Sequence, residues 1–247
     1  MRLPKLDERG AKPLDKAWLT ECELKKVLAG ELPEDVICQS NLFQSEPRLG
    51  IVRDNGVTKE GLLYQAQYLR MSEYIKIGAI VSGIDFQPTT KQRTRFGGEG
   101  RLASVEVTDD HILYPPKIQS NQGQNLLLML LTPADLGCKK ESWLPSSNFK
   151  KVNRPIIDGK KSTVWEVNIN GVELSIISAV LGKTVQEGGW NLRQNCPRPL
   201  KSLVPAGSVW FCQVKENLAS AIEKLHGFQI GEETALGRGE LFAGIWK

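Results

Sequence analysis

The sequence is poor in the residues on which most metal and acid–base enzymes depend. Only 2 histidines occur among 247 residues, His111 and His226. Imidazole is the commonest metal ligand and the side chain that titrates near neutral pH, so a centre built from several histidines is excluded. The 5 cysteines form no C-x-x-C pair, which argues against a zinc knuckle or a redox dithiol. We expect reduced cysteines that lie mostly in the core.

Long apolar runs are also missing. No segment approaches the roughly 18 apolar residues that a membrane span needs, and the amino terminus has no apolar leader region. These features predict a cytoplasmic protein without membrane contact. The 32 Lys and Arg exceed the 28 Asp and Glu by only +4. That excess favours anionic partners, yet it neither demands nor excludes a nucleic acid.

Two glycine motifs lack the context that their usual chemistry requires. Gly182-Lys183-Thr184 ends like a phosphate-binding loop, but Ile177 occupies the position where that motif needs its first glycine. Residues 98–103 match G-x-G-x-x-A, but a polar loop precedes them and a predicted strand follows. No serine lies in G-x-S-x-G and no paired acids stand out. We therefore expect no nucleotide cofactor, no metal and no hydrolase centre.

The first half of the chain predicts one helix followed by strands. Thr20 and Glu23 form a capping box before a helical apolar pattern that Gly30 ends. Residues 62–70 and 75–81 are rich in aromatic and β-branched side chains and are expected to pair as strands. Residues 87–100 are polar and glycine-bearing, and we expect a loop there, before a strand at 102–107.

The second half predicts a strand-rich domain. Proline at 115 and 116 indicates a break, so we expect domains at 1–117 and 118–247. Residues 126–131 form a short apolar run typical of a buried strand, and Asn170-Gly171 predicts a tight hairpin. The tail is predicted as a strand, a helix capped by Asn217 and a final strand. The fold class is α+β with a mostly antiparallel sheet.

Glycine-bearing basic loops are the candidates for binding. Residues 91–101 combine cations, glycines and Phe96, a mixture that suits single-stranded RNA, although a solvated basic hairpin tip has the same composition. Residues 237–244 form a second glycine loop. Its glycines could allow a protein or RNA backbone to approach closely, or could simply form a tight turn, and the sequence does not decide between the two. The candidate RNA-binding residues are Lys91, Arg93, Arg95, Gly97, Gly98, Gly100, Arg101, Arg193, Gly237, Arg238 and Gly239.

Six motifs in order resemble the family of the third subunit of the type III-B CRISPR effector, the Cmr complex. They are residues 46–51, 60–64, 97–101, 188–191, 204–210 and the terminal glycine loop. That family is a Cas-five-type branch of the RAMP group. The resemblance implies ferredoxin-like (RRM-like) domains with inserted loops and hairpins. It also implies a non-catalytic scaffold that holds the 5′ tag of the crRNA between the Cas-ten-type large subunit and the Cas-seven-type backbone subunit.

The resemblance leaves three points open. Family members usually carry a longer segment before the first helix, so we expect a separate chain or another subunit to supply it. A RAMP endoribonuclease that processes crRNA is the alternative function, with His111 or His226 as general base. A purely protein-contacting adaptor is a third possibility.

Overall fold

The chain forms two compact units. The computed structural model describes residues 14, 16–54, 56–85, 89, 91–97, 100–108, 123–137, 143–155 and 161–247. Unit 1 contains Met1–Cys38 and Pro115–Lys247, and unit 2 contains Gln39–Tyr114. Unit 2 is therefore inserted into the sequence of unit 1. Residues 115–117, where the sequence predicts a break, lie outside the described residues, and the assignment of 1–117 and 118–247 as RAMP domains stays a prediction.

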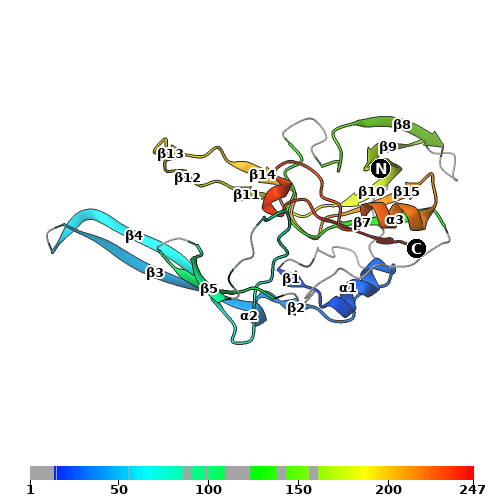
Figure 1. The fold of residues 1–247 in the computed structure, drawn as a ribbon. Helices are drawn as coiled ribbons and strands as arrows, with labels where there is room; N and C mark the ends of the chain where they lie inside the picture. The colour runs from blue at the N-terminus through cyan, green and yellow to red at the C-terminus, as the bar shows by residue number, and fades with distance from the viewer. Residues whose placement is uncertain are drawn as a thin grey trace. The chain divides into compact units, whose positions relative to one another are not determined.

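A six-stranded sheet in the order β16-β7-β15-β10-β9-β8 is the frame of unit 1 (Figure 1). Every neighbouring pair in it is antiparallel. The strands are β7 (Asn125–Leu130), β8 (Phe149–Pro155), β9 (Lys161–Ile169), β10 (Val172–Val180), β15 (Val209–Val214) and β16 (Leu241–Ile245). Asn170 and Gly171 join β9 to β10 with φ of 50° and 78°, as a type I′ turn requires.

Helix α3 (Leu218–Leu225) covers one face of this sheet. Asn217 caps the helix by accepting a hydrogen bond from the Ser220 backbone N–H at 3.2 Å. The buried helix residues Leu218, Ala221, Ile222 and Leu225 join one hydrophobic core with the alternate strand residues Leu126, Leu128, Leu130, Trp210, Cys212, Leu241 and Ala243. This core is the larger of two in unit 1, and burying each leucine contributes about 1.5–3 kcal/mol.

Helix α1 (Glu21–Leu28) packs on the remaining side chains of the same strands. Leu28 forms a second core with Leu127 and Phe242, flanked by Leu24, Met129, Phe211 and Trp246. A Cβ at Gly244 would overlap the backbone oxygen of Leu28. The strand therefore needs a glycine at this position to admit the end of the helix.

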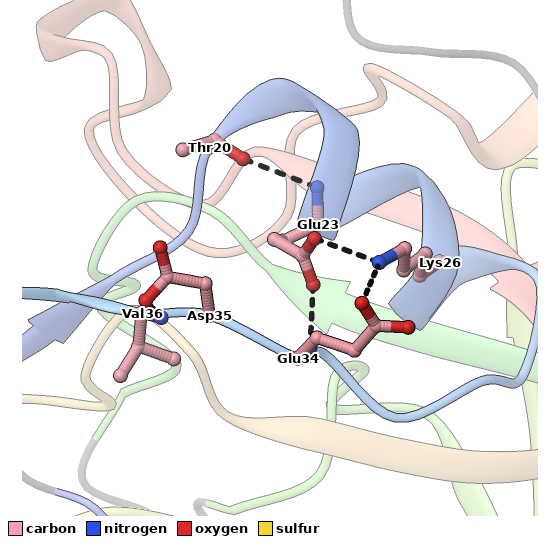
Figure 2. A network of polar contacts seen from close by, with 6 residues as sticks. All are labelled: Thr20, Glu23, Lys26, Glu34, Asp35 and Val36. Atoms are coloured by element: carbon pink, nitrogen blue, oxygen red, sulfur yellow. Dashed lines mark hydrogen bonds and ion pairs between the residues drawn. The ribbon is translucent and has the colours of Figure 1, made fainter.

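A polar network fixes the start of α1 (Figure 2). Thr20 Oγ1 accepts a hydrogen bond from Glu23 N at 3.2 Å. The Glu23 carboxylate accepts one from Lys26 Nζ at 2.9 Å and another from Glu34 N at 2.6 Å. These donors, Lys26 first, lower the pKa of Glu23. The network ties α1 to the segment that leads into β2 (Ile37–Cys38), which pairs with β1 (Ala17–Trp18).

Unit 2 consists mainly of two β-ribbons. Helix α2 (Gln39–Leu42) leads into β3 (Phe43–Asp54), which pairs with β4 (Val57–Met71) along almost its whole length (Figure 1). The second ribbon pairs β5 (Lys91–Arg95) with β6 (Leu102–Glu106). Neighbouring segments of sequence thus form both ribbons.

Most of the predicted elements are confirmed. The capped helix at 21–28, the strand at 125–130, the Asn170-Gly171 hairpin and the terminal strand, helix and strand all occur. The sheet-rich, mostly antiparallel architecture is also as expected.

Two secondary-structure predictions in unit 2 are wrong. Residues 75–81, predicted as a strand, form none. A turn in which Ile75 N donates to Ser72 O leads the chain away from β4, and β4 pairs with β3 instead. Residues 91–95, predicted as loop, form β5, whose cations alternate with Gln92 and Thr94 at the period of a strand.

The four cysteines that the structure describes are free, as expected, but they are not mostly buried. Among the four that the structure describes, only Cys212 is buried, while Cys22 and Cys38 are exposed and Cys196 is half-buried. Burial raises the pKa of the Cys212 thiol and keeps it protonated. Cys138 lies outside the described residues. Within the described part of the chain, no helix is long and apolar enough to cross a membrane.

We predict that Gly244→Ala lowers the free energy of unfolding of unit 1 by about 1–3 kcal/mol, because the new methyl group must push α1 away from β16. Gly78→Ala is the matched control, since a Cβ there meets nothing within 4 Å. Denaturant unfolding of the full chain measures both variants. Equal stabilities for the two would contradict the close packing of α1 on β16.

Candidate nucleic-acid interface

Three predicted RNA-binding residues form a row of cations along β5. Lys91, Arg93 and Arg95 alternate with Gln92 and Thr94 and lie opposite Glu106, Ser104 and Leu102 of β6. All three are exposed. Lys91 pairs with Glu106 at 3.5 Å, whereas neither arginine has a carboxylate partner among the residues described here. The row therefore presents at least two cations whose charge is not neutralised by any carboxylate that the structure describes.

Arg101 lies where the β5–β6 ribbon meets an aromatic ring of β4. Its guanidinium carbon is 4.0 Å from the centre of the Tyr68 ring, and that of Arg48 is 5.2 Å from the same centre. Such cation–π contacts contribute about 0.5–1 kcal/mol at an exposed site. We call the group formed by Glu46, Arg48, Tyr68, Arg70 and Arg101 the Tyr68 cluster.

Glu46 organises the arginines of the Tyr68 cluster. Its carboxylate accepts from Arg48 Nη2 at 2.6 Å and pairs with Arg70 Nη2 at 2.8 Å. These two guanidinium groups, Arg48 first, hold the pKa of Glu46 below its ordinary value. One carboxylate among three arginines leaves the cluster with an excess of positive charge.

Arg48, Tyr68 and Arg70 are not among the binding residues predicted from the sequence. The signal is present in the sequence as alternation, since Glu46 and Arg48, and Tyr68 and Arg70, are each two residues apart in a strand. Side chains at this spacing share one face. The sequence does not reveal the strand register, which places Glu46 opposite Tyr68.

The glycines of the first basic segment shape its hairpin. Gly97 and Gly100 have φ of 85° and 65°, and Phe96 N donates to Arg101 O at 3.0 Å across the turn. A Cβ at either glycine would meet nothing within 4 Å, so their conformation, and not crowding, requires glycine. Gly98 lies outside the described residues.

The terminal glycine loop is packed against the chain's own backbone. Gly237 ends the short 3₁₀ helix η1 (Thr234–Leu236) in a left-handed conformation. A Cβ at Gly239 would overlap the carbonyl oxygen of Ile230, whose N–H donates to Gly239 O at 2.9 Å. The close approach that Gly239 allows is therefore already made within unit 1.

Arg238, between these glycines, is only 9% exposed and is held by two carboxylates. Its Nη2 lies 2.5 Å from Glu187 Oε1, and its Nη1 lies 2.7 Å from Glu233 Oε2. A phosphate would have to displace one of these carboxylates to reach the guanidinium. Contact of Gly237, Arg238 and Gly239 with RNA stays a prediction.

Lys201 extends the same network. Its ammonium lies 3.1 Å from Asp135 Oδ2 and 2.8 Å from Glu233 Oε1. The hydrogen bonds that the ammonium donates to these carboxylates, Glu233 first, raise the pKa of Lys201, and the ammonium in turn lowers the pKa of Glu233. We call the network the ionic clamp; it comprises Asp135, Glu187, Lys201, Glu233 and Arg238.

His226 is fixed in the fold of unit 1. Its Nδ1 lies 3.2 Å from both the backbone N and the backbone O of Ala243, and its ring stacks on Phe242 at 4.8 Å. These contacts favour a structural role. His111 lies outside the described residues. Within the described segments, no group of three His, Cys, Asp or Glu side chains is placed to hold a metal ion.

We predict that the stabilising effect of Glu233 depends on pH. Because its pKa is lowered in the fold, its contribution is complete well above the ordinary value of 4.5 and is lost as pH falls below that value. Glu233→Gln should therefore be less stable than the wild type at pH 7, with the difference shrinking towards pH 3. Thermal unfolding across this range measures it, with the exposed neighbour Glu232→Gln as control. Parallel profiles for wild type and Glu233→Gln would contradict the ion pairs of Glu233.

Comparison with known proteins identifies the family. The model of the family described as CRISPR-associated protein (Cas_Cmr3) matches residues 1–246. No curated protein matches the chain. One similar solved structure is a chain of the type III-B Cmr-beta complex bound to cognate target RNA, with 18% identity and a TM-score of 0.36. The match covers 69% of this chain and 45% of that chain, so this chain spans less than half of its relative's length. The chain belongs to the CRISPR-associated Cmr3 family.

Proposed function

We propose that the chain is a non-catalytic, RNA-binding structural subunit of a type III-B CRISPR effector complex. In this role it holds the 5′ tag of the crRNA and joins the Cas-ten-type large subunit to the Cas-seven-type backbone subunit. Family membership supports the assignment to such a complex. The observation that carries the RNA-binding part is the β5 row, in which Arg93 and Arg95 are exposed and without a carboxylate partner in the described structure.

The Tyr68 cluster supports the same proposal. Phosphates of a single strand are bound by Arg and Lys, and bases stack on aromatic rings and guanidinium planes. Arg101 links the two ribbons of unit 2, since it follows the hairpin turn of β5–β6 and lies over Tyr68 of β4. A strand of RNA that follows β5 would therefore meet the arginines of the Tyr68 cluster at one end. Arg193 is a further candidate, in unit 1.

The strand order of unit 1 supports a RAMP-type, ferredoxin-like plan. Strands β16, β7, β15 and β10 follow one another across the sheet, and α3 joins β15 to β16, which flank β7. This is the split βαβ arrangement found in ferredoxin-like folds. The plan departs from the ideal between β7 and β10, where the described residues contain strands β8 and β9 and no helix.

A non-catalytic role is supported by the engagement of His226 with the backbone of β16 and by Arg238, whose charge is used within the ionic clamp. We expect repeat RNA to remain intact when incubated with the purified chain. Cleavage that disappears in His111→Ala or His226→Ala would instead favour the endoribonuclease.

We predict that Arg93→Ala/Arg95→Ala weakens binding of single-stranded RNA carrying the crRNA tag by about tenfold. Removing two phosphate contacts should also flatten the slope of log K against log salt by about 1.4, because fewer counterions are released. Titrations at several salt concentrations measure both quantities.

The charge-matched control is Lys25→Ala/Lys150→Ala, which removes two exposed cations of unit 1. This variant should retain the wild-type affinity and salt slope. If Arg93→Ala/Arg95→Ala binds like the wild type, the β5 row is not the RNA interface.

A further inference from the structure

Unit 1 carries a two-stranded arm, residues 185–203, which projects from the six-stranded sheet (Figure 1). At its base, β11 (Val185–Glu187) pairs with β14 (Lys201–Leu203). Near its tip, β12 (Trp190–Asn191) pairs with β13 (Cys196–Pro197). Arg198 N donates to Gly189 O at 2.8 Å and joins the two short ladders.

The ionic clamp holds the base of this arm. Glu187 and Lys201 lie directly opposite each other in the β11–β14 pair. The side chains of both contact residues in the rest of unit 1. Glu187 contacts Arg238, and Lys201 contacts Asp135 and Glu233. An isolated two-stranded hairpin is marginal in water, so these ion pairs provide support that the arm lacks by itself.

The turn at the tip is also ordered. Asn191 Oδ1 accepts hydrogen bonds from the backbone N–H groups of Arg193 and Gln194, each at 3.1 Å. Asn191 Nδ2 donates to Gln194 Oε1 at 2.9 Å, and Asn195 adopts a left-handed conformation with φ of 49°. Both ends of the arm are therefore fixed by polar contacts rather than by an apolar core.

Large apolar side chains nevertheless lie exposed on the arm. Trp190, opposite Pro197, is 51% exposed, and Leu192 in the turn is 89% exposed. Trp190 therefore lies on an ordered ribbon with about half of its surface exposed.

The tip carries positive charge only. Residues 188–200 include Arg193 and Arg198 and contain no Asp or Glu. Neither arginine has a carboxylate partner in the parts of the chain described, and the Arg198 stem runs beside Gly189, 3.7 Å from where a Cβ would lie. Arg238 and Lys201 at the base, by contrast, are neutralised within the ionic clamp.

We infer that the tip of the arm is a second binding site for single-stranded RNA, at which an unpaired base stacks on Trp190 while Arg193 and Arg198 bind the neighbouring phosphates. The inference rests on the proposed function of the chain as an RNA-binding subunit. A half-exposed indole and two arginines without a carboxylate partner in the described structure, all carried on one short tip, are the side chains that single-strand binding uses. The tip contains no carboxylate, and this favours RNA over a protein partner. A protein partner would also contact the exposed side chains of Leu192 and Leu200.

The test measures binding of a fluorescein-labelled oligouridine of about 20 nucleotides to the full-length chain. Trp190→Ala should weaken binding about tenfold, whereas Trp190→Phe, which keeps an aromatic ring, should weaken it less than about threefold. Arg193→Ala/Arg198→Ala should reduce the slope of log K against log salt by about 1.4. Unlabelled oligouridine should quench the tryptophan fluorescence of the wild type. The quenching should be smaller in Trp190→Phe.

Other results would overturn the arm as an RNA site, the proposed function, or both. If the arm variants bind like the wild type while Arg93→Ala/Arg95→Ala binds weakly, the arm is not an RNA site and the proposed function stands. If the wild-type chain binds neither oligouridine nor tag RNA, both fail. If Trp190→Ala and Leu192→Ser/Leu200→Ser keep full RNA affinity but lose a subunit on reconstitution of the complex, the arm is a protein-docking element.

Discussion

Unit 1 depends on the burial of three strands, β7, β15 and β16, on both of their faces. Antiparallel sheets often leave one face to solvent, and their strands then alternate between apolar and polar residues. In β7 the segment Leu126–Leu130 is apolar throughout, because α3 covers its even-numbered residues and α1 covers Leu127. Neither helix can be removed without exposing one face of this central strand. The amino-terminal helix is thus as much a part of the unit 1 core as the carboxyl-terminal one.

The positive charges of the chain fall into two groups with different uses. Arg238 and Lys201 are paired with carboxylates in the ionic clamp and hold the arm and the glycine loop to unit 1. Arg93, Arg95, Arg193 and Arg198 lie exposed, without such partners in the described structure. The net charge of +4 conceals this division. A cation between two glycines is therefore a weak sign of phosphate binding unless the nearby carboxylates are also known.

The sequence predicted the elements whose signals are local. The Thr20 N-cap, the Asn170-Gly171 turn and the Asn217 cap each depend on residues within one turn of the chain, and all three occur. The capping box predicted at Thr20 is formed only in part, because the Glu23 carboxylate accepts from Lys26 and Glu34. The ion pair of Arg238 with Glu187 could not be predicted in this way, since the two residues are far apart in sequence. The same holds for Arg101 and Tyr68, whose contact depends on how one ribbon of unit 2 packs on another. The predictions for residues 75–81 and 91–95 were wrong because they rested on local composition, which does not reveal the available strand partner.

The packing of α1 against β16 has a consequence for biosynthesis. Leu28 is among the first described residues to leave the ribosome, yet Phe242 and Gly244, against which it packs, are among the last. Contacts between segments so distant in sequence form late, because a long loop must close before they are made. Unit 2, whose ribbons pair neighbouring segments, can form while the rest of the chain is still being translated. The apolar face of α1 meanwhile remains uncovered, and exposed apolar surface of this kind favours aggregation until β16 has been made.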